Sequence, residues 1–260
     1  MSNHRIERTG GAPFDPDTHS VGHGGPRDDA PRVWAVVPAA GLGRRMGFAK
    51  QAAAYQGSTM TAVVTSVLLE SGVAGVVVVT RTPLVERLAL PDDARVAIAL
   101  NDLPDSEMID SVRIGCDALL DDPFTTTPGR DGPAPATGLN RQSTIDNRQS
   151  PRCPPAEPDG LLVLPADMPH VAVATCRVCI RAYMDQPTRI VVATVADKRA
   201  HPIIFPLALN QELQALTGKG GTATGGLRGL VDRHPRRLHL VSTSDPGAGR
   251  DIDTPSDYDR

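Results

Sequence analysis

The sequence predicts an α/β fold built on a mostly parallel sheet. Short apolar runs alternate along the chain with segments of helical periodicity, a pattern typical of strands that helices cover on both faces. Hydrophobic residues make up 40% of the 260 residues and aromatic residues only 3%, so Val, Leu, Ile and Ala must form the core. This length suits one large α/β domain, or a smaller one with extensions.

The first strand is predicted at Val33–Val37, a buried apolar run that ends at Pro38. A helix should follow from Thr59 to Ser71, because its apolar residues recur at helical spacing on one face, and Gly72 is its expected stop. The same periodicities predict strands at 76–79, 95–100, 161–164 and 190–195 and helices at 106–120 and 171–184. Ligands of such sheets bind beyond the carboxyl ends of the strands, so functional residues are expected in the loops that follow them.

Two segments rich in Gly, Pro and polar residues interrupt this pattern. Residues 1–31 lack periodicity and are predicted to be a disordered N-terminal tail. Residues 121–158 have a similar composition. Because a structureless loop of this length is rare inside a compact domain, we interpret them as a disordered insertion between two core elements. The predicted domain therefore spans 32–260.

Charge and hydropathy exclude several classes of protein. The net charge is −3 and no run of Lys and Arg is longer than a pair, which argues against a nucleic-acid-binding face. The N-terminus has no apolar segment of the kind found in secretory signals. No apolar run approaches the roughly 20 residues of a membrane span, so no membrane partner is expected and the expected location is the cytoplasm.

The four cysteines do not form a recognisable metal-binding set. Cys176 and Cys179 make a C-x-x-C pair, but neither Cys116, Cys153 nor a nearby histidine completes a zinc site. The pair also falls in a predicted helix. We therefore expect reduced thiols rather than a metal or redox centre.

A loop rich in small residues follows the first strand: Ala39-Ala40-Gly41-Leu42-Gly43-Arg44-Arg45-Met46-Gly47. Small residues let the backbone approach a ligand closely, and amides in such a loop can hold phosphate oxygens. Arg44, Arg45 and Lys50 add positive charge for a triphosphate. The spacing matches neither the dinucleotide-binding G-x-G-x-x-G nor the Walker G-x-x-x-x-G-K-[ST]. On spacing alone, a surface turn with incidental basic residues stays open.

Carboxylates follow the strand at 161–164 and recur near the C-terminus. Asp167 is a candidate Mg²⁺ ligand, because Mg²⁺ commonly takes one or two carboxylates together with phosphate oxygens. The alternative for Asp167 is a cap of the helix that follows. Asp251 and Asp253 are the candidate partner ligands, and the alternative there is a helix start with Thr254 as its N-cap.

These features belong to a longer set of motifs. The segment Pro38 to Lys50 resembles the signature loop of nucleotidyltransferases with a GT-A-like fold. Further motifs follow in the order found in the molybdenum-cofactor cytidylyltransferases and their MobA-like relatives, which the chain resembles over about residues 33–120 and 160–260. They are Asn101 with Glu107-Met108-x-x-Ser111, then Asp167-Met168-Pro169, His201-Pro202, and Asp251-Ile252-Asp253-Thr254-Pro255.

The resemblance implies a single GT-A-like, Rossmann-like nucleotidyltransferase domain that uses Mg²⁺. It assigns phosphate contacts to Arg45 and Lys50, with Lys50 stabilising the leaving pyrophosphate, and a Mg²⁺ ligand to Asp167. His201 and Arg228, as a retained arginine, are expected on the acceptor side; before a strand, a structural role for His201 is the alternative. The expected nucleotide-binding residues are Ala39, Ala40, Gly41, Gly43, Arg44, Arg45, Lys50, Asn101 and Ser111.

Three departures from the family pattern bear on the substrate more than on the type of reaction. Glu107 replaces a glycine and places a carboxylate near the expected anion site. The acidic residue of the family's Gly-Asp-x-Gly-Ala-Arg stretch is absent from 218–228. The opening Val-Pro-Ala-Ala-Gly is shared with the cytidylyltransferase of isoprenoid precursor synthesis, although that family lacks the Asp-Met-Pro and His-Pro motifs.

We therefore expect transfer of a nucleotidyl group from an NTP to a phosphorylated small acceptor of the molybdopterin type, with release of pyrophosphate. Ala40 favours CTP, since cytidylyl members resemble Ala-Ala-Gly and guanylyl members Ala-Gly-Gly. Two alternatives stay open: the same fold acting on a sugar phosphate or methylerythritol phosphate, and a non-catalytic module that binds nucleotide or cofactor. The macromolecular partner that this interpretation suggests is a molybdoenzyme or its maturation factor.

Overall fold

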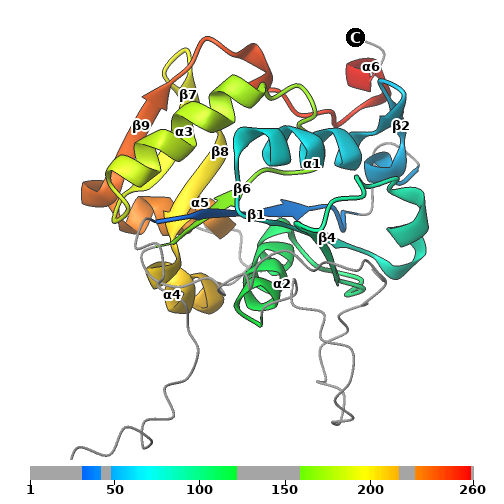
Figure 1. Cartoon of the computed structure of the whole chain (residues 1–260), viewed down its shortest axis with the longest axis horizontal. Coiled ribbons are helices and arrows are strands. Elements are labelled where there is room, and N and C mark those ends of the chain that lie inside the picture. The colour runs from blue at the N-terminus through cyan, green and yellow to red at the C-terminus, as the bar shows by residue number, and fades with distance from the viewer. Residues whose placement is uncertain (1–30, 42–47, 122–158, 217–225, 259–260) are drawn as a thin grey trace, which may run out of the picture.

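A computed structural model describes residues 31–41, 48–121, 159–216 and 226–258. Its main sheet has the strand order β5-β4-β1-β6-β8-β7-β9, and a second, two-stranded sheet pairs β2 with β3 (Figure 1). The strands of the main sheet are β1 (Val33–Pro38), β4 (Val76–Thr80), β5 (Val96–Leu100), β6 (Gly160–Val163), β7 (Ile190–Val195), β8 (Lys198–Pro206) and β9 (Leu238–Ser242). The short pair is β2 (Ala54–Tyr55) and β3 (Ser58–Thr59).

Most neighbouring strands of the main sheet are parallel. β5, β4, β1 and β6 run in one direction, and β9 is parallel to β7. β8 is antiparallel to both of its neighbours, β6 and β7. The predicted mostly parallel α/β sheet is therefore confirmed, and the carboxyl ends of β1, β4, β5 and β6 meet at one edge.

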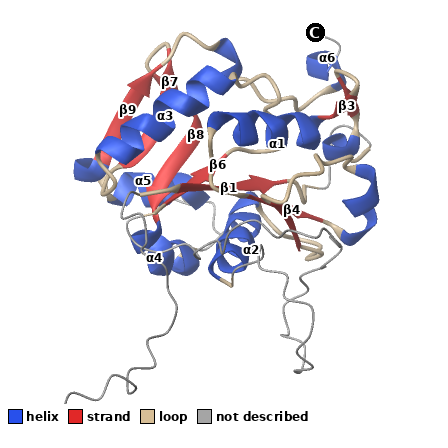
Figure 2. Ribbon diagram, in the orientation of Figure 1, coloured by secondary structure: helices blue, strands red, loops and turns tan. Residues whose placement is uncertain are grey.

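Helices cover both faces of this sheet (Figure 2). One face carries α1 (Met60–Ser71) and α3 (Val173–Asp185), which contact each other. The other carries α2 (Met108–Leu120), α4 (Asn210–Ala215) and α5 (Gly226–Arg233). The short helical segments are η1 (Lys50–Ala52), η2 (Thr82–Arg87), η3 (Leu207–Leu209), η4 (Pro235–Arg237), η5 (Pro246–Gly249) and α6 (Pro255–Tyr258).

Each face of the sheet has its own hydrophobic core, and β1 contributes to both. Val33, Ala35 and Val37 pack in the core beneath α1 and α3. Trp34 and Val36 point to the opposite side and pack in the core beneath α2, α4 and α5. This alternation follows from the two-residue period of a strand, and an uninterrupted apolar run is what a strand buried on both faces needs.

The predicted helix after β1 forms at the predicted residues. Thr59 is the N-cap of α1, and its side chain accepts a hydrogen bond from the amide of Ala62 at 3.1 Å. Gly72 ends the helix in the left-handed conformation, with φ of 91°, where a residue without Cβ is favoured. Local sequence signals therefore fix both ends of α1.

The C-terminal third contains elements that the sequence patterns did not predict. β8 includes His201, so this residue lies within a strand and not before one. β9 is an edge strand with only partial burial, and α4 and α5 are short. These elements lack the long apolar periodicity that identified the others. Contacts with β7 and α2, which a local pattern does not reveal, position them in the fold.

The predicted tail and insertion fall almost wholly on residues 1–30 and 122–158, which lie outside the described residues. Where the chain resumes, the buried side chain of Asp159 accepts hydrogen bonds from the backbone amide of Arg32 and from the indole of Trp34, at 2.9 and 3.1 Å. This contact fixes the start of β6 beside the start of β1. Among the described residues, no helix is both long and apolar enough to cross a membrane.

Candidate active site

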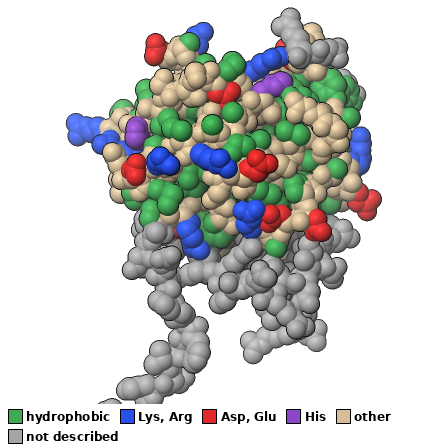
Figure 3. Space-filling view, turned by 45° about the horizontal axis from the view of Figure 1, so that its top comes forward, with side chains coloured by type: hydrophobic (Ala, Val, Ile, Leu, Met, Phe, Trp, Pro, Cys, Tyr) green, Lys and Arg blue, Asp and Glu red, His purple; other side chains and the backbone are tan. Residues whose placement is uncertain are grey.

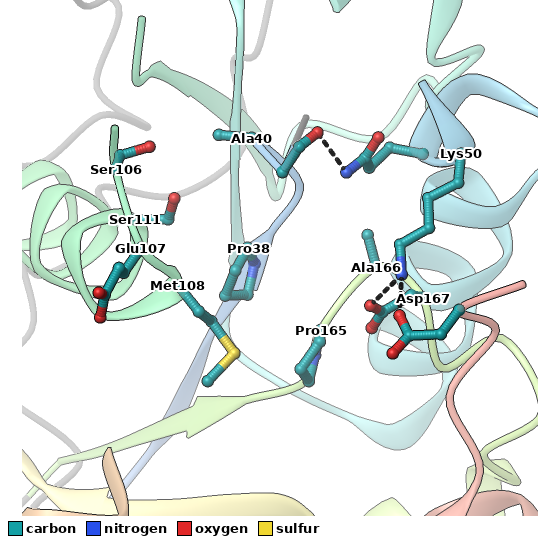
Figure 4. A pocket seen from close by; sticks show the side chains of 13 residues that line it. Pro38, Ala40, Lys50, Ser106, Glu107, Met108, Ser111, Pro165, Ala166 and Asp167 are labelled. Atoms are coloured by element: carbon teal, nitrogen blue, oxygen red, sulfur yellow. Dashed lines mark hydrogen bonds and ion pairs between the residues drawn. The ribbon is translucent and has the colours of Figure 1, made fainter. Parts of the chain in front are cut away.

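A pocket of about 310 Å³ opens at the carboxyl ends of β1 and β6 (Figure 4). Such a volume is at the lower end of the roughly 300–1,000 Å³ typical of small-molecule sites. The residues that line it come from the loops after β1, β5 and β6, from η1 and α2, and from the C-terminal segment. They are Pro38, Ala40, Gly41, Lys50, Gln51, Ser106, Glu107, Met108, Ser111, Pro165, Ala166, Asp167 and Asp253.

The Lys50 ammonium is the centre of a charged cluster on one side of this pocket. Its Nζ lies 2.8 Å from Asp167 Oδ2 and 2.6 Å from Asp253 Oδ1, and it donates to the carbonyl of Ile252 at 2.9 Å. These three contacts can use all three protons of the ammonium. Lys50 is 9% exposed, whereas the side chains of Asp167 and Asp253 are 23% and 40% exposed, so the ammonium is shielded while the carboxylates remain accessible from the pocket. The structure thus brings together Lys50, Asp167 and Asp253, as the sequence motifs predict.

The charge state of this lysine follows from two opposing effects. Burial by itself lowers the pKa of the Lys50 ammonium, but the charges and hydrogen bonds of Asp167 and Asp253 outweigh burial and raise the pKa above its ordinary value. Lys50 therefore stays protonated at neutral pH and acts as a fixed positive charge.

Backbone hydrogen bonds hold the two carboxylates in place. The amide of Ala166 donates to the carbonyl of Pro38 at 3.2 Å, which joins the loop after β6 to the end of β1. The amide of Ile252 donates to the carbonyl of Asp167 at 2.9 Å, which brings the C-terminal segment against the same loop. Asp253, the residue after Ile252, consequently contacts Lys50, whereas Asp251 is exposed and does not line the pocket.

Asp167 does not cap the helix that follows it. α3 begins at Val173 with Ala172 as its N-cap. The carboxylate of Asp245 satisfies this helix end, since it accepts from the amide of Ala172 at 2.8 Å and from the hydroxyl of Thr175 at 2.7 Å. The helix-cap alternative for Asp167 is therefore wrong, and its carboxylate belongs to the pocket.

His201 lies close to the cluster but does not line the pocket. Its Nδ1 is 3.4 Å from the carbonyl oxygen of Val163, the last residue of β6. Burial lowers the pKa of His201, and the Val163 carbonyl, Asp167 and Asp251 oppose that shift only in part. The imidazole is thus neutral at neutral pH, and its contact with β6 is a structural one.

The opposite side of the pocket is formed by the start of α2. Asn101, after β5, donates to the hydroxyl of Ser111 at 2.9 Å, and both residues are buried. Glu107 is the N-cap of α2 and makes a capping box with Asp110, in which each side chain accepts from the other residue's amide. The departure at Glu107 therefore has a structural use, and it places acidic groups at this side.

Two pocket-side residues received no role from sequence reasoning. Arg81, directly after β4, donates to the carbonyl of Ala40 and to that of Leu103, both at 2.8 Å, so it joins the loop after β1 to the loop after β5. Gln51 donates to the carbonyl of Gly41 at 2.7 Å, while its buried Oε1 has no hydrogen-bond partner among the described residues. The sequence signal for Arg81 is its position directly after a predicted parallel strand, at the edge of the sheet where ligands bind.

Some predicted site residues cannot be placed beside the cluster. Gly43, Arg44 and Arg45 fall in 42–47, outside the described residues. Ala39 is buried directly before the pocket-lining Ala40. Arg228 is exposed on α5 and does not line the pocket.

The donor set of the cluster fits a hard divalent cation. Asp167, Asp253 and the Ile252 carbonyl direct oxygens to one point, at which the ammonium of Lys50 lies. Mg²⁺ commonly binds to one or two carboxylates and completes its shell with water and substrate phosphates. The described part of the chain contains no cluster of three or more His, Cys, Asp or Glu that could hold a metal ion, so two carboxylates are the acidic groups at this point.

The cysteines in the described residues show no metal or redox arrangement. Cys116, Cys176 and Cys179 are buried and unpaired, and Cys176 and Cys179 lie on α3 as predicted. Burial raises the pKa of each thiol to about 12, so none forms a thiolate at neutral pH.

Figure 3 shows how charged side chains are distributed on one face of the molecule. Lys and Arg side chains are scattered there among acidic and apolar ones instead of forming a continuous basic patch. A polyanion would need such a patch, because phosphate contacts dominate its affinity.

Comparison with protein families identifies one match. Residues 35–238 match the family model described as the MobA-like NTP transferase domain. Among curated protein sequences, none is significantly similar to this chain.

Solved structures share the fold. Rv0371c from Mycobacterium tuberculosis H37Rv has 25% sequence identity and a TM-score of 0.60, covering 89% of this chain and 97% of that one. Its complex with manganese aligns at 21% identity and a TM-score of 0.55, covering 88% and 97%. A nucleotidyl transferase from Methanothermobacter thermautotroptrophicus has 21% identity and a TM-score of 0.59, covering 87% and 94%. A CMP:2-keto-3-deoxy-manno-octonic acid synthetase complexed with CTP has 15% identity and a TM-score of 0.56, covering 86% and 94%.

Proposed function

The chain belongs to the MobA-like NTP transferase family, and from this premise we propose that it is a Mg²⁺-dependent cytidylyltransferase. It moves the nucleotidyl group of CTP to a phosphorylated acceptor of the molybdopterin type and releases pyrophosphate. The observation that carries the proposal is the convergence of Lys50, Asp167 and Asp253 at one side of a pocket whose wall includes Ala40 and Gly41.

The charges of the pocket orient the nucleotide. The triphosphate lies toward Lys50 and the loop after β1, where Arg44 and Arg45 of the signature motif supply further positive charge. The start of α2 disfavours phosphate, because it carries the carboxylates of Glu107 and Asp110. The base therefore lies on the α2 side, near Ser111 and Met108.

The reaction needs no covalent enzyme intermediate. A phosphate oxygen of the acceptor attacks the α-phosphorus, the bond from that phosphorus to the bridging oxygen breaks, and pyrophosphate leaves with the electron pair. Lys50 and Arg45 stabilise the charge that develops on the leaving group. Asp167, Asp253 and the Ile252 carbonyl would hold the cation, and a bound Mg²⁺ would supply charge neutralisation for the phosphates. The rest of the rate enhancement comes from positioning the two substrates against each other.

The choice of cation, base and acceptor rests on separate arguments. A structurally similar protein binds manganese, which supports a divalent metal. Another binds CTP, and the methyl group of Ala40 in the pocket wall narrows the space for a larger purine. The molybdopterin-type acceptor, and a molybdoenzyme or its maturation factor as the recipient of the product, follow from the resemblance of the Asp-Met-Pro and His-Pro motifs.

The test is pyrophosphate release with each of the four NTPs and three acceptors: molybdopterin, a sugar phosphate and methylerythritol phosphate. The proposal predicts release with CTP and molybdopterin that depends on both substrates and on Mg²⁺. Release with a different acceptor would reassign the substrate within the family. Tight nucleotide binding without release under any combination would favour a non-catalytic binding module.

A further inference from the structure

The Lys50 ammonium lies at the point between Asp167 and Asp253 that a divalent cation would need. We propose that Lys50 and the cation exclude each other there, so that Lys50 keeps the metal site closed until a nucleotide triphosphate draws the lysine away. This inference rests on the proposed function, since it takes the triphosphate as the anion that releases Lys50. It makes metal binding depend on the nucleotide.

The distances leave no room for both cations. Lys50 Nζ is within 2.9 Å of all three oxygens of the cluster. Mg²⁺ binds its oxygen ligands at about 2.0–2.1 Å, so an ion bridging the two carboxylates would lie close to the present position of Nζ. Two positive charges at contact distance repel each other, and the low exposure of Lys50 limits how far water can screen that repulsion. Either the ammonium or the metal ion can neutralise the carboxylates.

Displacement of Lys50 without a replacement partner is costly. The residue is 9% exposed, and moving its ammonium away from Asp167 and Asp253 without a new anionic partner would leave its charge unpaired. On the α2 side, Glu107 and Asp110 already accept hydrogen bonds from each other's amides, and Asp110 also forms an ion pair with Arg113 at 3.2 Å. In the absence of nucleotide, a metal ion must overcome this cost in order to bind.

A triphosphate removes that cost. It offers charged oxygens to the flexible four-carbon side chain of Lys50, with which the ammonium forms charge-assisted hydrogen bonds. The metal ion takes the place of the ammonium beside Asp167 and Asp253. The ammonium in turn pairs with phosphate oxygens. No group is left unpaired, so the nucleotide and the metal favour each other's binding.

The experiment measures Mn²⁺ alone, without nucleotide or acceptor, by the electron paramagnetic resonance signal of the free ion. Lys50→Met should bind Mn²⁺ at least about tenfold more tightly than the wild type, a typical size for coupling between two sites. Lys198→Met is the matched control, since it removes an exposed lysine at the start of β8 and should leave the affinity unchanged. Adding Asp167→Asn to Lys50→Met should abolish the gain, which locates the ion at the cluster.

Lys50→Gln provides a second comparison, because its amide keeps hydrogen-bond donors if Lys50→Met does not fold. The rise in melting temperature on addition of Mn²⁺ should be larger for either folded variant than for the wild type. Equal Mn²⁺ affinity in the wild type and the Lys50 variants would overturn the proposal. If the wild type releases pyrophosphate but binds Mn²⁺ as tightly as the Lys50 variants do, the exchange is refuted and the proposed function stands. Tighter Mn²⁺ binding by the variants, together with no pyrophosphate release by the wild type, would support the exchange and refute the proposed function.

Discussion

The Lys50 ammonium and the Asp167 carboxylate form an ion pair of 2.8 Å at the meeting point of the loops that follow β1 and β6. The two segments come together because β1 and β6 are adjacent parallel strands. A motif at the end of each strand is therefore sufficient to place a cation beside a carboxylate. The second carboxylate, Asp253, is brought to this pair by the backbone hydrogen bond from Ile252 to Asp167.

Asp167→Asn should lower turnover by about a hundredfold, the loss typical of one electrostatic contact at a reacting centre. The amide keeps the size of the side chain and can still accept a hydrogen bond from Lys50, so the melting temperature should change little. Steady-state kinetics across a Mg²⁺ titration is the measurement. Only partial recovery is expected at high Mg²⁺, because the charge acts in the transition state as well as in metal binding; complete recovery would restrict Asp167 to metal affinity.

Asp253→Asn and Asp251→Asn should differ sharply. Asp253 contacts Lys50 at 2.6 Å, so its loss should reduce turnover by about tenfold or more. Asp251 is exposed two residues earlier, and its substitution should alter turnover by no more than about twofold. The same steady-state assay compares the two variants, each being the charge-matched control for the other. Equal effects would show that the C-terminal segment does not act through Asp253.

Arg81→Met should weaken nucleotide binding about tenfold, since charge-assisted hydrogen bonds to two loop carbonyls are lost. Arg81 touches the Ala40 and Leu103 carbonyls and not the phosphate side, so KM for the NTP should rise more than kcat falls. Arg199→Met, which breaks an exposed ion pair with Asp232, is the matched control. If kcat falls while KM stays constant, Arg81 acts on the reaction and not on the shape of the pocket.

The thiols of Cys116, Cys176 and Cys179 should resist alkylation in the native protein at neutral pH. Burial raises the pKa of each to about 12, and the thiolate is the reactive form. Peptide mapping by mass spectrometry after treatment with iodoacetamide, with and without denaturant, measures the modification of each cysteine. Rapid native labelling of Cys176 or Cys179 would revive a redox role for the C-x-x-C pair.

Much of the fold could be predicted because its first part obeys local rules. The all-valine run of β4, the capped helix α1 and the apolar run of β6 each carry a complete signal in a few residues. β9 and α5 carry none, since β9 is a half-exposed edge and α5 is short. Their places depend on β7 and α2, which no local pattern reveals.

The site divides in the same way. The sequence predicted Lys50, Asp167 and a C-terminal aspartate because motifs after strands point to one edge of a sheet. It could not distinguish Asp253 from Asp251, since that choice depends on the Ile252–Asp167 hydrogen bond. Nor could it identify Asp245 as the cap of α3, because the two segments approach each other only in the folded chain.

The most direct test of nucleotidyl transfer is to follow radioactive phosphorus from CTP into the products. Wild-type protein, molybdopterin and Mg²⁺ are incubated with CTP carrying radioactive phosphorus at either the α or the γ position. The account predicts α-label on the acceptor and γ-label in pyrophosphate, with both strongly reduced in Asp167→Asn. Transfer of the γ-label to the acceptor, or release of label as inorganic phosphate with none on the acceptor, would contradict it.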